Sequence, residues 1–186
     1  MSKHSSHSPE VVLRNYFHAK DENRPHVLDH VFTSDASLYV HNKSENIDFP
    51  AATRGRGAIA DVLVRQFNRT YENIYSFYLA RPPTTAKSFI CTWLVGMTEK
   101  DSKSTRVGCG TYEWTFSPEP PCLASTLVIS IHAMSILAPD NTGAVLTWLL
   151  QLGYPWCAPE QAFSLAPSTH ELAPILQYLR RTAIGA

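Results

Sequence analysis

The stretch YFHAKDENRPHVLDHVFTSDASLYVHN, residues 16–42, decides the fold class because its apolar residues change from a helical period to a strand period. Its beginning continues a helix predicted over 9–20, which starts with the capping hydroxyl of Ser8 followed by a proline. A second short helix is predicted over 25–33. The apolar run at 38–40 then favours a strand that ends in a polar loop.

The chain beyond this stretch contains one more predicted helix and then four predicted strands. The helix is expected to run from Gly57 to about Tyr71. The strands are the β-branched and aromatic runs at 73–83, 88–98, 106–116 and 126–137. Because short polar segments connect these runs, successive strands should pair antiparallel. This order predicts an α+β domain in which helices cover one face of a curved antiparallel sheet.

The last part of the chain follows another pattern. We expect a disordered tail over 1–8, a main domain over 9–138 and a C-terminal extension over 139–186. The extension contains a short apolar helical run, a proline-rich loop and a final amphipathic run in which Pro174 is a candidate helix start. It could cover the mouth of the domain as a lid or contact a second subunit.

The composition excludes several classes of partner. The 186 residues carry no formal net charge, so no overall field favours nucleic acid or an anionic membrane. No apolar run reaches membrane-spanning length, and the four cysteines lack the spacing of a zinc site. We therefore expect a soluble, cytoplasmic protein with free thiols, without a metal or cofactor, that binds neither nucleic acid nor membranes.

The element order and the opening stretch resemble the nuclear-transport-factor-2-like superfamily, in its SnoaL-like and ketosteroid-isomerase-like branch. The run over 16–35 resembles the first two helices of a ketosteroid isomerase. VFTSDASLYV (31–40) is similar to the turn into the first strand of that family, and TRGRGAIADVL (53–63) to its glycine-started third helix. The resemblance covers about residues 9–138. It implies a cone-shaped domain with one pocket between the concave sheet face and the helices.

The same resemblance suggests which residues would form a site. Tyr16 falls where the isomerases keep a tyrosine that donates a hydrogen bond to a developing oxyanion. Their general base falls at Val40, which cannot transfer a proton, and the acid of a later strand falls at about Tyr112. His132 would then carry the proton, because imidazole titrates near neutral pH. The predicted catalytic residues are therefore Tyr16, Tyr112 and His132.

If Tyr112 points inward, strand alternation puts Gly110 and Trp114 inward too. The same resemblance implies that Phe89, Cys91, Trp93 and Val95 face the cavity from the preceding strand, and Ser130, His132 and Met134 from the last one. The predicted pocket residues are Val40, Phe89, Cys91, Trp93, Val95, Trp114 and Met134. Such an apolar and aromatic lining suits a small hydrophobic molecule that bears an oxygen.

Two functions remain as alternatives. In the first, the pocket binds such a molecule and, if the protein is an enzyme, isomerises, cyclises or dehydrates it by cofactor-independent proton transfer. In the second, the protein is a non-catalytic homodimer with a filled pocket, joined through outward apolar residues such as Ile90 and Leu94. An open pocket with unpartnered polar groups favours the first alternative. Hydrogen-bonded Tyr16 and His132, each an ordinary core residue, favour the second.

Overall fold

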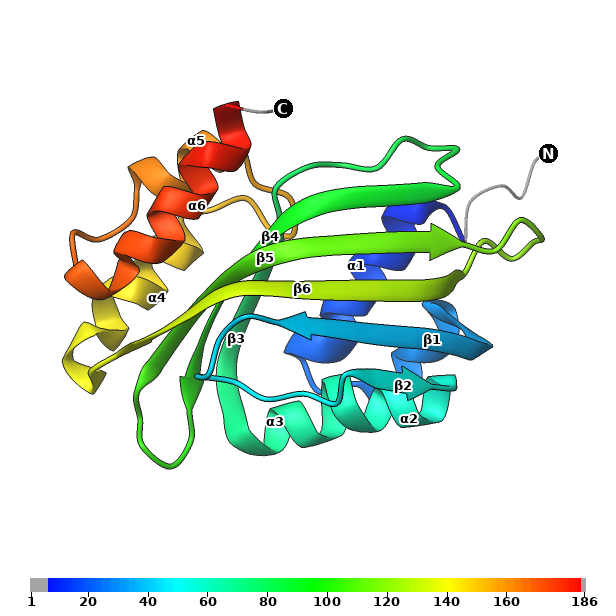
Figure 1. Ribbon diagram of the computed structural model, residues 1–186, viewed down its shortest axis with the longest axis horizontal. Coiled ribbons are helices and arrows are strands. Elements are labelled where there is room, and N and C mark those ends of the chain that lie inside the picture. Colours follow the sequence, from blue (N-terminus) through cyan, green and yellow to red (C-terminus); the bar gives the residue numbers. More distant parts are fainter. Residues whose placement is uncertain (1–6, 185–186) are drawn as a thin grey trace.

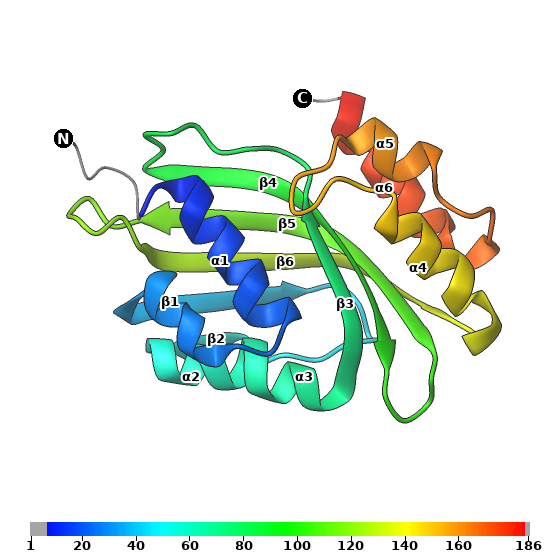
Figure 2. The same cartoon turned by 180° about the vertical axis from the view of Figure 1, so that it is seen from behind.

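A computed structural model describes residues 7–184, which form a curved six-stranded sheet with helices on both of its faces (Figures 1 and 2). The tail expected over 1–8 lies outside the described residues except for residues 7 and 8. Ser8 caps the first helix, since its hydroxyl accepts a hydrogen bond from the amide of Val11 at 3.3 Å.

The helices fall into two groups along the chain. Those before the long strands are α1 (Pro9–Asp21), the 3-10 helix η1 (Pro25–His30), α2 (Arg56–Ala60), the π-helix η2 (Asp61–Gln66) and α3 (Phe67–Thr70). Those after them are η3 (Pro139–Asn141), α4 (Thr142–Leu150), α5 (Pro159–Ser164), η4 (His170–Leu172) and α6 (Ala173–Ile184). Figure 2 shows the first group on one side of the sheet. The α5 helix arises in the segment that the sequence predicts as a loop, while Pro174 lies at the start of α6 as expected.

The strands are β1 (Phe32–Asn42), β2 (Ala52–Arg54), β3 (Tyr71–Tyr78), β4 (Ser88–Glu99), β5 (Thr105–Phe116) and β6 (Ala124–Leu137). Their order in the sheet is β2-β1-β6-β5-β4-β3. The four long strands from β3 to β6 pair antiparallel, as the short connections predict. The first strand lies parallel to β6 and carries the short β2 on its other edge, and the sequence indicated neither pairing.

The second predicted helix is shorter than its pattern indicates. It ends at His30, and Phe32 already belongs to β1, where it pairs with Ala124 of β6. The residues Val31 to Thr33 are β-branched or aromatic and therefore fit a strand as well as a helix. Long-range pairing with β6 decides between the two states.

The two faces of the sheet bury two separate apolar clusters. The inner cluster joins α1, α2 and η2 to the concave face, where it includes Tyr16, Trp93 and Tyr112. The outer cluster lies on the opposite face, where Leu94 and Val107 are buried beneath the C-terminal extension. Alternate residues of β4 and β5 thus point into different clusters, as the pleat of a strand requires.

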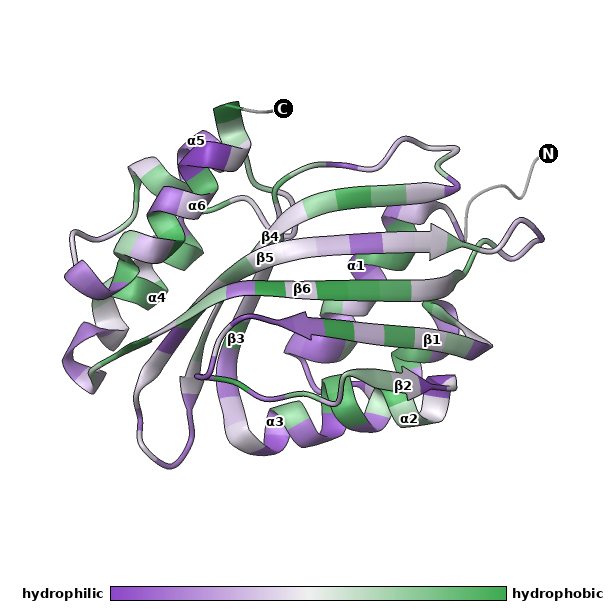
Figure 3. Ribbon diagram, in the orientation of Figure 1, coloured by the Kyte–Doolittle hydropathy of each residue, from purple (hydrophilic) through white to green (hydrophobic). Residues whose placement is uncertain are grey.

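The C-terminal extension packs against the outer face of the sheet through α4, α5 and α6 (Figure 1). Hydrophobic residues mark α4 and much of β6 in Figure 3. The buried Trp148 of α4 donates a hydrogen bond from Nε1 to the carbonyl of Ala162 at 2.9 Å, which ties α4 to α5. The extension also joins the edge of β3, because the amide of Tyr78 donates to the carbonyl of Pro155 at 2.7 Å.

Two further expectations concern thiols and membranes. Cys91, Cys109, Cys122 and Cys157 are all free thiols, as predicted. Within residues 7–184, no helix has the length and apolar character needed to cross a membrane.

Candidate functional site

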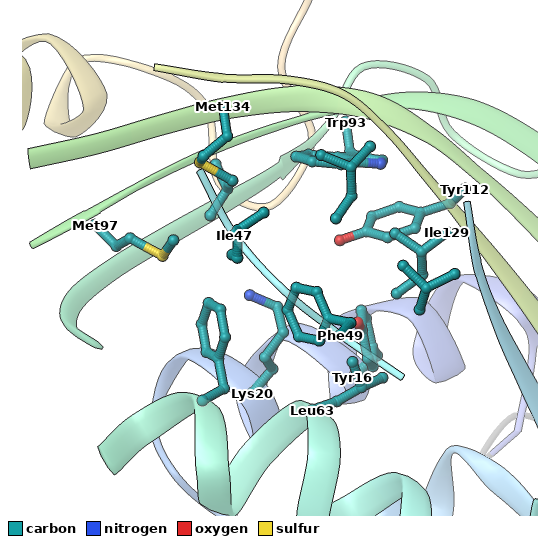
Figure 4. Close-up of a pocket in the computed structure, with 14 residues that line it drawn as sticks. Tyr16, Lys20, Ile47, Phe49, Leu63, Trp93, Met97, Tyr112, Ile129 and Met134 are labelled. Atoms are coloured by element: carbon teal, nitrogen blue, oxygen red, sulfur yellow. The ribbon is translucent and has the colours of Figure 1, made fainter. Parts of the chain in front are cut away.

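The space between the concave sheet face and the helices encloses a small cavity of about 40 Å³ (Figure 4). The predicted catalytic residues Tyr16 and Tyr112 line it, as do the predicted pocket residues Val40, Trp93, Val95 and Met134. Phe89, Cys91 and Trp114, also predicted, lie in the same buried cluster without bordering the cavity. Lining residues that the sequence analysis missed are Lys20, Ile47, Phe49, Leu63, Phe67, Met97, Ile129 and Ile131.

Tyr16 occupies the centre of this aromatic environment. It is fully buried on α1, and its ring meets those of Tyr112 and Trp114 edge-to-face at 6.0 and 5.1 Å. Its hydroxyl has no hydrogen-bond partner within the described residues. Burial raises the pKa of Tyr16, and this effect outweighs the opposite influence of the nearby Tyr112 phenol, whose hydroxyl does not meet hydrogen-bond geometry with Tyr16. The phenol therefore stays protonated and keeps a free donor.

Tyr112 and Trp93 continue the polar side of the cavity from β5 and β4. Their rings stack with centroids 5.5 Å apart. Burial raises the pKa of Tyr112 well above its usual range, so its hydroxyl also stays protonated. The buried indole nitrogen Nε1 of Trp93 has no hydrogen-bond partner in the described part of the chain. A buried donor in this state costs about 1–3 kcal/mol relative to a satisfied one.

His132 does not face the cavity, so its expected inward position is wrong. Cys109 pairs with Ala133 and Gly110 pairs with Ile131, which leaves His132 as the extra residue of a β-bulge. Before the bulge Ile131 points inward, and after it Met134 does, because the extra residue reverses the alternation. Ser130 alternates with the inward Ile129 and Ile131 and is therefore not among the lining residues either, contrary to expectation. The imidazole is exposed and stacks on Tyr178 of α6 with ring centroids 4.2 Å apart.

The outward position of His132 predicts a pH-dependent contribution to stability. Partial burial lowers the pKa of His132, and the positive charges of Lys43 and Arg181 lower it further. The unfolded imidazole, with a pKa of about 6.5, then binds a proton more readily than the folded one. The free energy of unfolding should therefore fall as the pH drops below about 6.5.

Urea unfolding between about pH 5 and 8 measures this effect. The difference in unfolding free energy between the wild-type protein and His132→Gln should change below about pH 6.5, with the wild type losing more. Arg181→Gln should reduce that loss, because it removes one of the repelling charges. Parallel curves for the wild type and His132→Gln over the whole range would contradict the prediction.

Lys20 brings a charge to the cavity that the sequence analysis did not assign. It lies four residues after Tyr16, on the same face of α1, and this spacing is the signal that could have found it. The residue is only 5% exposed. Figure 4 shows its nitrogen pointing into the cavity. Nζ lies 4.9 Å from the ring centroid of Phe67.

A polar network holds the Lys20 ammonium in place. Nζ donates to Asp21 Oδ1 and to Ser76 Oγ, each at 2.7 Å. Ser76 in turn donates its amide and its hydroxyl to the two carboxylate oxygens of Asp21, at 2.9 and 2.8 Å. Tyr154 of the extension adds a longer hydrogen bond to Asp21 Oδ2 at 3.4 Å. Asp21 thus has four donors, drawn from α1, β3 and the extension.

The loop between β1 and β2 contributes Ile47 and Phe49 to the wall of the cavity. A second hollow, of about 200 Å³, opens there and includes Gln66 and Tyr71 in its wall. Ile47, Phe49 and Phe67 line both spaces and therefore form the partition between them. The rings of Phe49 and Phe67 stack with centroids 6.2 Å apart. A movement of the Phe49 ring would join the two spaces.

The chemistry of the cavity follows from its polar groups. The side chains of Tyr16, Tyr112, Trp93 and Lys20 are all hydrogen-bond donors. Among the described residues that line the cavity, none carries a carboxylate or an imidazole. The arrangement can hold an acceptor oxygen within an apolar, aromatic wall. Proton abstraction would need a base brought from elsewhere.

Comparisons with known proteins concern the fold. No model of a known protein family and no curated protein sequence matches this chain. A hypothetical protein with a ketosteroid isomerase-like fold from Catenulispora acidiphila, solved in complex with trimethylamine, is 14% identical, with a TM-score of 0.53 over 66% of this chain and 85% of that one. The hexachlorocyclohexane dehydrochlorinase LinA-type3 from Novosphingobium barchaimii is 12% identical, with a TM-score of 0.54 over 68% of this chain and 86% of that one.

A nuclear transport factor 2-like superfamily protein from Salmonella enterica is 15% identical, with a TM-score of 0.50 over 67% of this chain and 88% of that one. Identities this low establish a shared fold, and a shared fold hosts unrelated functions. The cone-shaped α+β fold predicted from the sequence is thereby confirmed.

Proposed function

We propose that this chain, whose fold is that of the nuclear-transport-factor-2-like proteins, binds a small and mainly apolar molecule through an acceptor oxygen in the cone cavity. The observation that carries the proposal is the buried hydroxyl of Tyr16 at an aromatic cavity, which has no hydrogen-bond partner among residues 7–184. Most buried polar groups in native proteins have a hydrogen-bond partner, so a buried donor without one points to a missing partner such as a water molecule or a ligand. A ligand oxygen near Tyr16 and Tyr112 would supply the missing acceptor.

The size of the cavity limits what enters without rearrangement. At about 40 Å³ it is smaller than the cavity of roughly 150 Å³ that accommodates benzene in another protein. A ligand with a ring therefore has to displace part of the wall. Phe49 is suited to this movement because it belongs to a loop and separates the cavity from the outer hollow. Met97 and Met134 can adapt the rest of the wall, since unbranched thioether chains repack easily.

Binding is favoured over acid-base catalysis by the place of the titratable groups. The proton transfer suggested by the resemblance requires a carrier beside the reacting atom. His132, the candidate for that role, lies on the outer side of the sheet against α6. The phenols of Tyr16 and Tyr112 stay protonated and could polarise an oxygen, but they do not supply a base.

The homodimeric alternative remains a separate proposal, but the apolar sheet surface available for a subunit contact is smaller than the sequence predicted. Leu94, one of the two residues expected at a subunit contact, is buried beneath the extension of the same chain. Ile90 on the same strand is 64% exposed and stays accessible to a second copy. A dimer through this face would therefore use the part of the sheet near Ile90.

Tyr16→Phe tests the proposed function with cyclohexanone and methylenecyclohexane as probes, which differ only in an oxygen against a methylene. Cyclohexanone should shift the indole N–H resonance of Trp93 and bind the wild type more tightly than methylenecyclohexane does. Tyr16→Phe should weaken cyclohexanone binding about tenfold, the equivalent of one hydrogen bond. The free variant should unfold at equal or higher free energy, because the mutation removes an unpartnered buried hydroxyl.

Tyr78→Phe is the matched control. Tyr78 is equally buried, but its hydroxyl donates to the carbonyl of Leu13 at 2.9 Å and does not border the cavity. This variant should lose about 1 kcal/mol of stability and bind cyclohexanone like the wild type. Equal binding of both probes to the wild type, or no saturable shift at all, would refute the proposed function.

A further inference from the structure

Lys20 is a buried cation whose hydrogen bonds leave one donor unused. An ammonium group has three N–H donors. Two of them go to Asp21 and Ser76, and the third has no hydrogen-bond partner within residues 7–184. In Figure 4 the nitrogen points into the cavity, and the ring centroids of Phe67 and Phe17 lie 4.9 and 5.7 Å from Nζ. The free donor of a charged group therefore faces apolar and aromatic side chains.

The carboxylate of Asp21 does not occupy this position. Its two oxygens accept hydrogen bonds from Lys20, from the amide and hydroxyl of Ser76, and from Tyr154. Its side chain is 4% exposed and does not border the cavity. The four donors hold the Asp21 carboxylate away from the cavity. Lys20 is therefore the one charged residue in the described cavity wall that a ligand can contact.

We infer that the polar end of the ligand is a carboxylate, held by Lys20 together with the phenols of the cavity. This inference rests on the proposed function and specifies its ligand class. A carboxylate is an acceptor-only group, which is the complement of a wall whose polar side chains are all donors. Hydrogen bonds between charged partners are about twice as strong as neutral ones. The ammonium also disfavours a cationic ligand, although aromatic side chains surround it.

The first test compares cyclohexanecarboxylate, cyclohexanecarboxamide and cyclohexylmethylammonium, three probes with one ring and different charges. The wild type, labelled with ¹⁵N-lysine, should bind the carboxylate at least about tenfold more tightly than the carboxamide, as a charge-assisted hydrogen bond predicts. The Nζ resonance of Lys20 should move with the carboxylate and stay in place with the ammonium probe. This measurement requires no variant that could fail to fold.

The second test removes the charge of the network. The double variant Lys20→Met/Asp21→Asn neutralises both partners and leaves no buried charge without a counterion. It should lose the preference for carboxylate over carboxamide and still bind cyclohexanone. The exposed pair Lys103 and Glu72, whose N and O atoms lie 3.2 Å apart, supplies the control Lys103→Met/Glu72→Gln, which should keep the preference.

The outcomes separate this inference from the proposed function. Cyclohexanone binding without a preference for carboxylate in the wild type would refute the carboxylate inference and leave the proposed function intact. Tighter binding of the ammonium probe would refute the inference as well. Failure of all probes, cyclohexanone included, would refute both. A preference that survives in Lys20→Met/Asp21→Asn would show that another group recognises the charge.

Discussion

Asp21→Asn should lower the free energy of unfolding by about 3 to 5 kcal/mol, the loss typical of a buried ion pair that keeps only one charge. The side chains of Lys20 and Asp21 are 6% and 4% exposed, so water cannot solvate the remaining ammonium. The shape of the side chain hardly changes. The loss therefore measures charge rather than packing, and urea unfolding followed by circular dichroism would record it.

Adding Lys20→Met to Asp21→Asn should restore most of the lost free energy of unfolding. Lys20→Met/Asp21→Asn contains no uncompensated charge, and buried ion pairs replaced by neutral groups of similar size are often as stable as before. Glu72→Gln breaks an exposed pair and should cost less than about 1 kcal/mol. If Asp21→Asn costs no more than Glu72→Gln, the network does not hold a buried charge in solution.

Trp148→Ala should lower the free energy of unfolding by about 3 to 5 kcal/mol. The side chain is 2% exposed and packs in the outer cluster between the sheet and the extension. The mutation also removes the hydrogen bond from Nε1 to the carbonyl of Ala162. Urea unfolding would give the total loss. Hydrogen exchange should show that amides of α4 and α6 lose protection before those of β5.

Leu150→Ala on the same helix is the control for this prediction. Leu150 is 66% exposed, so its truncation should change stability by less than about 0.5 kcal/mol. If Trp148→Ala resembles Leu150→Ala, the extension does not pack on the sheet as described. Because Tyr154 connects the extension to Asp21, undocking should also loosen the network around Lys20.

Local patterns accounted for most elements of the fold. The apolar spacing after Ser8 predicted α1, and the β-branched runs predicted the four long antiparallel strands. These inferences succeeded because helical and strand periods are properties of neighbouring residues, which the sequence contains directly.

The failures occurred where a distant segment decided the outcome. The bulge at His132 reversed the alternation of β6. The residue types of β6 contain no signal from which a bulge could be predicted. Pairing with β6 turned Phe32 into a strand residue. The extension packs on the outer face of the sheet through the outer cluster. The amphipathic pattern of the extension shows only that one of its sides is buried, and not against which surface.

By itself, the sequence determined the fold class and most helices and strands, because each depends on local hydrophobic period. Only the tertiary structure decided that His132 lies outside, that Lys20 lies inside, and what the extension covers. The charge of Lys20 is tolerated in the core because Asp21 and Ser76 meet it there, and Ser76 is 56 residues away in the chain. A local pattern records that a side chain is buried, whereas its partner depends on how distant segments pack.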